Sequence, residues 1–192
     1  MKRQPLRTLS YGLLVGLLWV TTTGPSFGED ASASGEASEK AMGLEAQAVF
    51  ETLKGMEGTW SGDFDNTETG SKMEAIHVFE VSAAGTVVME TMAPGTVHEM
   101  INMYHLDGED LMLTHYCAGG NQPQMRLDRE TSTAENLIFD FTGGTNLDPT
   151  KDPHIHSARL ELKGENSLGS HWSSWNEGKA AMDVEFQLSR QK

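Results

Sequence analysis

Apolar and polar residues alternate along most of the chain from Gly58 onward, and Gly, Asn, Asp and Pro interrupt the alternation at short intervals. A period of two residues is typical of strands that bury one face. Before this region, apolar residues recur at helical spacing, which predicts a short helix over residues 41–54. Ten strands are predicted after it, over residues 59–65, 72–82, 85–92, 96–106, 110–118, 123–130, 136–142, 155–163, 168–176 and 179–190.

Short strands joined by tight turns predict an antiparallel sheet in which consecutive strands are neighbours. Asp107-Gly108 and Asn176-Glu177-Gly178 have the composition of hairpin turns. Closing such a sheet into a barrel removes its exposed edges. The predicted fold is therefore all-β, an antiparallel up-and-down β-barrel of about ten strands with a short N-terminal helix. A β-sandwich is the alternative.

The first 28 residues have the pattern of a secretory signal peptide. Three basic residues precede an apolar run over residues 11–20, and Ser26-Phe27-Gly28 fits a cleavage site. The alternative is a membrane anchor, but a spanning helix needs about 20 apolar residues. We therefore expect export to the periplasm or beyond, with no membrane insertion after cleavage. The expected organisation is a signal peptide over 1–28, a flexible leader over 29–40 and a lipocalin-like barrel domain over 41–192.

The composition narrows the range of partners. The chain has a net charge of −14, and loss of the three basic residues of the signal peptide makes it −17. Such a surface repels nucleic-acid phosphates, so no nucleic-acid partner is expected. Cys117 is the only cysteine, so no internal disulfide can form and a hydrophobic core must stabilise the fold. We expect a monomer.

Several histidines fall on strand faces that are otherwise apolar. The alternation places His77 on the same face as Phe79, and His115 on the same face as Leu113. A buried histidine needs hydrogen-bond partners, so these side chains are candidates for orienting a ligand inside the barrel. The apolar contact surface for that ligand is predicted from Phe79, Phe139, Phe141 and Met125.

His154 and His156 are two residues apart on one predicted strand and therefore face the same way. That spacing suits two imidazoles on one metal ion, with a third ligand from His115, Cys117 or His98. The alternative is that they bond to polar neighbours at a barrel mouth. His115 and Cys117 also share a face, but a catalytic pair needs direct contact, so a buried structural cysteine is the preferred interpretation. The candidate metal ligands are His154, His156 and His115.

The segment from Leu53 to Gly62 resembles the opening of lipocalin-like (calycin) barrels, where a short helix leads into a Gly-x-Trp motif. In that superfamily the Trp plugs the closed end and a basic residue of the last strand packs across it. The resemblance therefore implies that Trp60 and Arg190 form this structural pair. The barrel also resembles nitrobindin-type haem barrels in shape, but their axial histidine matches no position here.

A wider resemblance, over residues 50–190, is to uncharacterised, often exported bacterial proteins of lipocalin-like type. The shared segments are His98-Glu99-Met100, Tyr104 to Gly108, Thr114 to Cys117, Gly120 to Pro123, Thr145-Asn146-Leu147 and His154-Ile155-His156. That family has no established activity, so the resemblance bears on the fold. The predicted ligand-binding residues are His77, His98, Tyr104, His115, Tyr116, Asn121, Asn146, His154 and His156.

Taken together, these patterns predict an exported, soluble barrel that binds a small, partly apolar ligand in its interior. One alternative is a metal-dependent or histidine-assisted enzyme that uses the same cavity. A second alternative is a structural barrel whose interior is filled by side chains. The expected partner is a small molecule, and the sequence identifies no cofactor.

Overall fold

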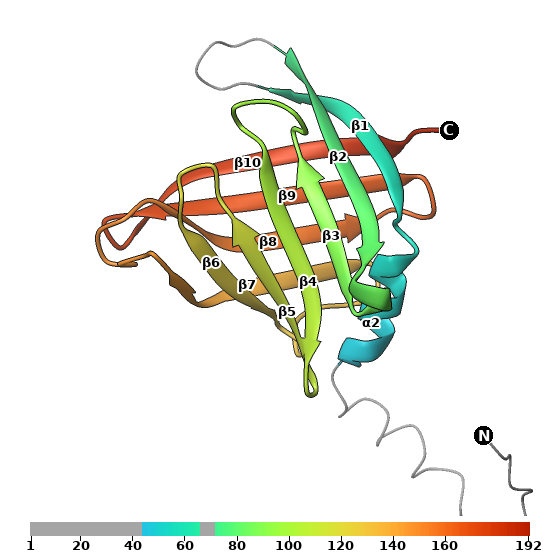
Figure 1. The fold of residues 1–192 in the computed structure, drawn as a ribbon, viewed down its shortest axis with the longest axis horizontal. Helices are drawn as coiled ribbons and strands as arrows, with labels where there is room; N and C mark the ends of the chain where they lie inside the picture. Colours follow the sequence, from blue (N-terminus) through green and yellow to red (C-terminus); the bar gives the residue numbers. More distant parts are fainter. Residues whose placement is uncertain (1–43, 66–71) are drawn as a thin grey trace, which may run out of the picture.

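The computed structural model describes residues 44–65 and 72–192, so the predicted signal peptide and leader lie outside the described residues. Within these residues, ten strands form a closed antiparallel barrel with one short α-helix (Figure 1). Each strand pairs with the next in sequence, and the first pairs with the last. The elements are α2 (Ala46–Lys54), β1 (Gly58–Asp65), β2 (Lys72–Ser82), the 3-10 turn η1 (Ala83–Gly85), β3 (Val87–Met92), β4 (Met100–Asp107), β5 (Asp110–Tyr116), β6 (Gln122–Leu127), β7 (Asn136–Thr145), β8 (His154–Leu162), β9 (Ser167–Asn176) and β10 (Lys179–Arg190).

Helix α2 lies against one end of the barrel (Figure 1). Its buried residues, Ala46, Val49, Phe50 and Leu53, recur at helical spacing and join the barrel core. The helix was predicted to span residues 41–54, but Leu44 precedes it in a non-helical conformation. The N–H of Leu44 donates to the carbonyl of Arg129 at 3.0 Å, which ties the chain to the loop after β6 before the helix begins.

The predicted pairing of Trp60 with Arg190 is confirmed at the end of the barrel that α2 covers. The guanidinium carbon of Arg190 lies 4.4 Å from the centre of the Trp60 ring. Its two terminal nitrogens donate to the carbonyls of Glu57 at 2.6 Å and Gly55 at 2.8 Å. Gly58 has a φ of +131°, and a Cβ there would lie 3.3 Å from the guanidinium. The segment between α2 and β1 is therefore clamped onto the last strand.

Large side chains fill the barrel interior on the side of α2. Phe79, Tyr104, Leu113, Met125 and Phe139 are among the fully buried residues. Phe79, Met125 and Phe139 were predicted to contact a ligand, and the structure instead places them in this packed core. The part of the interior that is open must therefore be lined by other residues.

Several predicted strands are shorter than the alternation indicates, and at two of them polar side chains form the turn that limits the strand. The predicted strand over residues 96–106 begins only at Met100, since the carboxylate of Glu99 accepts the N–H of Gly95 at 2.6 Å. The predicted strand over residues 123–130 ends at Leu127, because the Asp128 carboxylate accepts the N–H of Glu130 at 2.9 Å.

Candidate functional site

A cavity of about 340 Å³ opens at the end of the barrel opposite α2. Its walls come from the ends of β3, β5 and β9 and the starts of β4, β8 and β10, which meet at one rim of an antiparallel barrel. Helix α2 leads into the start of β1, which lies at the other rim. The apolar side chains of the wall include Met92, Met100, Ile155, Trp172, Val184 and Phe186.

Burial distinguishes the floor of this cavity from its rim. His115, Trp172 and Phe186 are buried and form the floor, with His115 only 1% exposed. Met182 is 52% exposed and belongs to the rim. The rings of His115 and Trp172 lie 5.4 Å apart, and the indole N–H of Trp172 donates to the hydroxyl of Ser170 at 2.8 Å. Ring packing and a hydrogen bond thus fix the orientation of the Trp172 side chain beside His115.

Four neighbouring strands, β2 to β5, carry a buried polar network beside the cavity floor. Its centre is Glu90, which is 0% exposed. Oε1 of Glu90 lies 2.7 Å from Nδ1 of His77. Oε2 accepts from the side-chain amide of Asn102 at 2.8 Å and from the hydroxyl of Tyr104 at 2.7 Å. Asn102 in turn lies beside His115, whose Nδ1 is 2.7 Å from the amide oxygen.

The carboxylate of Glu90 is held in its charged form by these contacts. Burial by itself raises the pKa of Glu90, but the hydrogen bond and electrostatic attraction of His77, with the hydrogen bonds of Tyr104 and Asn102, outweigh it. The pKa of Glu90 is therefore below its ordinary value. Burial and the nearby Glu90 charge raise the pKa of Tyr104 well above its ordinary value, which keeps the phenol a donor.

The charge on Glu90 determines the direction of each hydrogen bond as far as His115. A carboxylate only accepts, so the NH₂ group of Asn102 must face Glu90 and its carbonyl must face His115. Nδ1 of His115 is then the donor, and Nε2 carries a lone pair. Burial lowers the pKa of His115 to about 4, against a smaller upward pull from Glu90, so the ring is neutral at pH 7.

Nε2 of His115 has no hydrogen-bond partner among the residues that the structure describes, although the atom is buried. Buried polar atoms without a partner are rare and costly, at roughly 1–3 kcal/mol. Asn121 Oδ1 and Asn136 Oδ1 share this condition in the described part of the chain, but neither residue lines the cavity. His115 is therefore the residue of the cavity lining that keeps a buried side-chain nitrogen without a partner, within the described residues.

His154 and His156 are brought together, but only His154 lines the cavity. Nε2 of His154 lies 3.1 Å from Nδ1 of His156. A β-bulge between Ile155 and Ser157 breaks the alternation, so Ile155 lines the cavity and His156 does not. His156 instead stacks on Trp175, with ring centres 3.8 Å apart.

The predicted three-histidine metal site is not formed. His115 and His154 reach the same cavity, and His156 stacks between Phe141 and Trp175 away from it. Across residues 44–65 and 72–192, no group of three or more His, Cys, Asp or Glu side chains is placed to hold a metal ion. Phe141, predicted as a ligand contact, likewise faces His156, with ring centres 4.8 Å apart, and not the cavity.

Six other predicted binding residues do not line the cavity. His77 and Tyr104 belong to the buried network around Glu90. His98 lies in the exposed turn before β4, and Tyr116 is exposed at the end of β5. Asn121 supports the rim by donating to the carbonyl of Pro153 at 2.8 Å. Asn146 is exposed and donates to the carbonyl of Gly120 at 2.8 Å. The two asparagines thus cap loops, which is one of the ordinary uses of asparagine in turns.

Cys117 is half-buried at the cavity rim, whereas the sequence predicted a buried structural residue. Its sulfur accepts the backbone N–H of Gly119 at 3.4 Å. Among the described residues, no hydrogen bond joins Sγ of Cys117 to His115 or to His154. The arrangement therefore lacks the direct contact of a thiol–imidazole catalytic pair.

Sequence reasoning missed Glu90 and Asn102, the two residues that orient His115. The signal for Glu90 was present, because alternation places it on the same face as the buried residues Val88 and Met92. An acidic residue on a buried face demands partners. Its partners are on other strands. Asn102 lies directly opposite Glu90 in the ladder, and His115 lies directly opposite Asn102 on the next strand.

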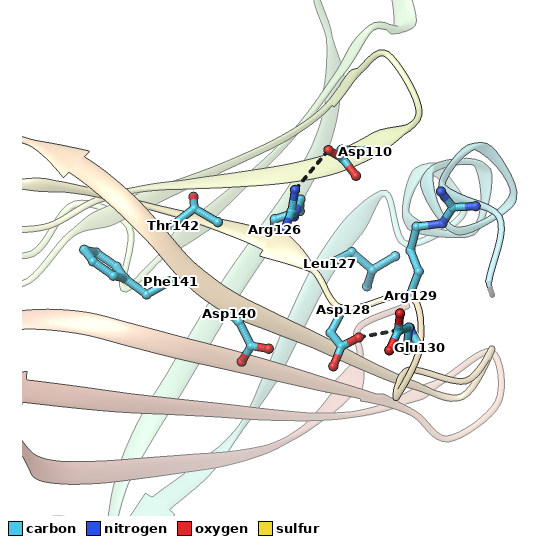
Figure 2. Close-up of a pocket in the computed structure, with 9 residues that line it drawn as sticks. All are labelled: Asp110, Arg126, Leu127, Asp128, Arg129, Glu130, Asp140, Phe141 and Thr142. Carbon is cyan, nitrogen blue, oxygen red and sulfur yellow. Dashed lines mark hydrogen bonds and ion pairs between the residues drawn. The ribbon is translucent and has the colours of Figure 1, made fainter.

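A larger depression, of about 510 Å³, lies over the end of β6 and the middle of β7 and carries several charged side chains (Figure 2). Figure 2 shows Arg126 joined to Asp110, with the two side chains 3.3 Å apart. Arg129 donates to the carbonyl of Leu44 at 2.8 Å, and Asp128 holds the turn after β6. Four of the charged side chains are thus bonded within the protein. The barrel-mouth cavity, which has an apolar wall and a buried nitrogen without a partner among the described residues, is the stronger candidate site.

Comparison of the chain with models of known protein families and with curated proteins finds no match. The lipocalin-like resemblance and bacterial export therefore stay predictions. In the two described segments, none of the helices combines the length and the apolar character needed to cross a membrane. The geometry of the site is accordingly the basis for assigning a function.

Proposed function

We propose that the protein binds a small, partly apolar molecule in the barrel-mouth cavity. The observation that carries the proposal is an apolar cavity whose floor holds one buried, unpartnered histidine nitrogen, among the residues described. Binding pockets for small molecules are concave, mostly apolar and furnished with a few oriented polar groups. The volume of about 340 Å³ is within the usual range for such pockets.

Binding is favoured over the two alternatives by the same residues. A purely structural barrel gains nothing from an oriented acceptor at the floor of an open cavity, because a buried atom without a partner costs stability. For catalysis, the cavity offers no nucleophile hydrogen-bonded to a base among its described lining residues. A neutral acceptor in an apolar cup is instead suited to holding a ligand in one orientation.

The remaining parts of the proposal concern family and location. We place the protein among lipocalin-like up-and-down barrels, supported by the pairing order of the strands and the contact between Trp60 and Arg190. Export to the periplasm or beyond is supported by the charged start, the short apolar run and Ser26-Phe27-Gly28. We propose that the mature protein acts as a monomer.

Equilibrium dialysis against naphthalene tests the binding site. Val184 lines the cavity, and Val78 lies between two inward-facing residues of β2 and therefore faces outward. Val184→Trp should fill the cavity and weaken naphthalene binding at least tenfold, whereas Val78→Trp should bind like the unsubstituted protein. Far-UV circular dichroism checks that both variants fold. Absence of binding to the unsubstituted protein, or equal binding by both variants, would contradict the proposal.

A further inference from the structure

We infer that the cavity selects neutral ligands that carry a hydrogen-bond donor, such as an alcohol, a phenol or an N–H heteroaromatic, and that Nε2 of His115 accepts the hydrogen bond from this donor. The inference rests on the proposed binding function and adds the chemical class of the ligand. Its starting point is the buried Nε2 atom, which has no partner within the described residues.

The acceptor character of this nitrogen follows from contacts outside the cavity. Glu90 receives the amide N–H of Asn102, and Asn102 receives the N–H of His115. Turning the Asn102 amide over would place its carbonyl against the Glu90 carboxylate, which is unfavourable. Glu90 and Asn102 are therefore positioning residues that hold His115 in a single tautomer, with Nδ1 protonated and the lone pair on Nε2.

The other polar groups of the cavity wall are already bonded. Nδ1 of His154 donates to the carbonyl of Asp152 at 2.9 Å, so Nε2 of His154 is an acceptor and receives Nδ1–H of His156. The hydroxyl of Ser174 donates to the carbonyl of Met182 at 3.2 Å. His115 is consequently the lining residue whose polar atom is left for a ligand, within the part of the chain that the structure describes.

Charge excludes ionised ligands. The ionised Glu90 lies beyond the cavity floor, and the whole chain carries a net charge of −14, so an anion meets repulsion. A cation is attracted by the same negative charge, but it meets no carboxylate among the residues of the cavity wall, and burying it among Met, Val, Trp and Phe side chains is costly. A neutral donor avoids both costs and satisfies the lone pair of His115.

Three probes of similar shape separate the inference from the proposed function. Equilibrium dialysis at pH 7.5 compares 1-naphthol, naphthalene and 1-methoxynaphthalene, of which only 1-naphthol is a donor. The unsubstituted protein should bind 1-naphthol about 3- to 10-fold more tightly than naphthalene, as one net hydrogen bond allows. It should bind 1-methoxynaphthalene no more tightly than naphthalene.

The variant His115→Leu should lose the preference for 1-naphthol and still bind naphthalene within about threefold of the unsubstituted protein. His98→Leu, in the exposed turn before β4, is the matched control and should keep the preference. Equal binding of all three probes by the unsubstituted protein would overturn the inference and leave the binding function standing. Binding of none of them would overturn both. If His115→Leu does not fold, the comparison of the three probes on the unsubstituted protein still tests whether the cavity prefers a hydrogen-bond donor.

Discussion

Titration of His115 should make the stability of the barrel depend on pH in a defined window. The pKa of this histidine is about 4 in the folded protein, because burial penalises the charged ring, and its ordinary value is 6.5. As the pH falls below 6.5, the unfolded chain takes up a proton that the folded protein refuses until about pH 4. Stability is therefore lost between these two values and changes no further, through this group, at lower pH.

The magnitude follows from the two pKa values. Lowering the pH from 7.5 to 4.5 should reduce the free energy of unfolding by about 2 to 3 kcal/mol through His115 alone. Burial lowers the pKa of His156 as well, which adds a loss of the same sign. The folded pKa of Glu90 is below its ordinary value of 4.5, so Glu90 affects stability mainly at still lower pH.

Urea unfolding followed by tryptophan fluorescence, at several pH values between 4.5 and 7.5, measures this dependence. His115→Leu removes the titrating group and leaves the other groups in place. The loss of stability on acidification should therefore be smaller in His115→Leu by about 2 to 3 kcal/mol. His98→Leu serves as control and should behave like the unsubstituted protein. Equal losses in His115→Leu and the unsubstituted protein would refute the assignment of a buried, neutral His115.

Two further predictions concern the closed end and the start of the chain. Trp60→Ala should lower the free energy of unfolding by about 3–5 kcal/mol, because the ring is buried under Arg190. Trp175→Ala should lower it by less, because Trp175 is only partly buried. Equal losses of the two variants in urea melts would contradict this. N-terminal sequencing of exported protein should begin close to Glu29, and an intact Met1 would contradict cleavage near Gly28.

The barrel was predictable because the information for it is local. Alternation and turn residues identify strands and hairpins, and the two-residue turns between β4 and β5 and between β9 and β10 occur where the sequence predicted them. The contact of Trp60 with Arg190 followed from the family resemblance. Strand ends were less predictable, because a single carboxylate such as that of Asp128 can end a strand by bonding the backbone.

The site was only partly predictable because it depends on register and on one irregularity. The sequence identified His115 and His154, which line the cavity, but regular alternation also directed His156 inward. The bulge beside Ile155 has no simple sequence signature, and it removes His156 from the interior. Glu90 was overlooked because its partners become evident only when the strands are aligned.

The pairing of β1 with β10 has a consequence for how the chain folds. Every other neighbouring pair in the ring joins consecutive strands, so those pairs can form as local hairpins. The seam between β1 and β10 lies beside the bond from Arg190 to Gly55, which spans 135 positions, so closing the ring carries a larger loop-closure entropy. Ring closure is thus the contact of highest sequence separation in the described fold, and it needs both ends of the domain at once. A nascent chain that lacks β10 would leave β1 and β9 as open edges, so the completed ring is also what protects this sheet from pairing with a second chain.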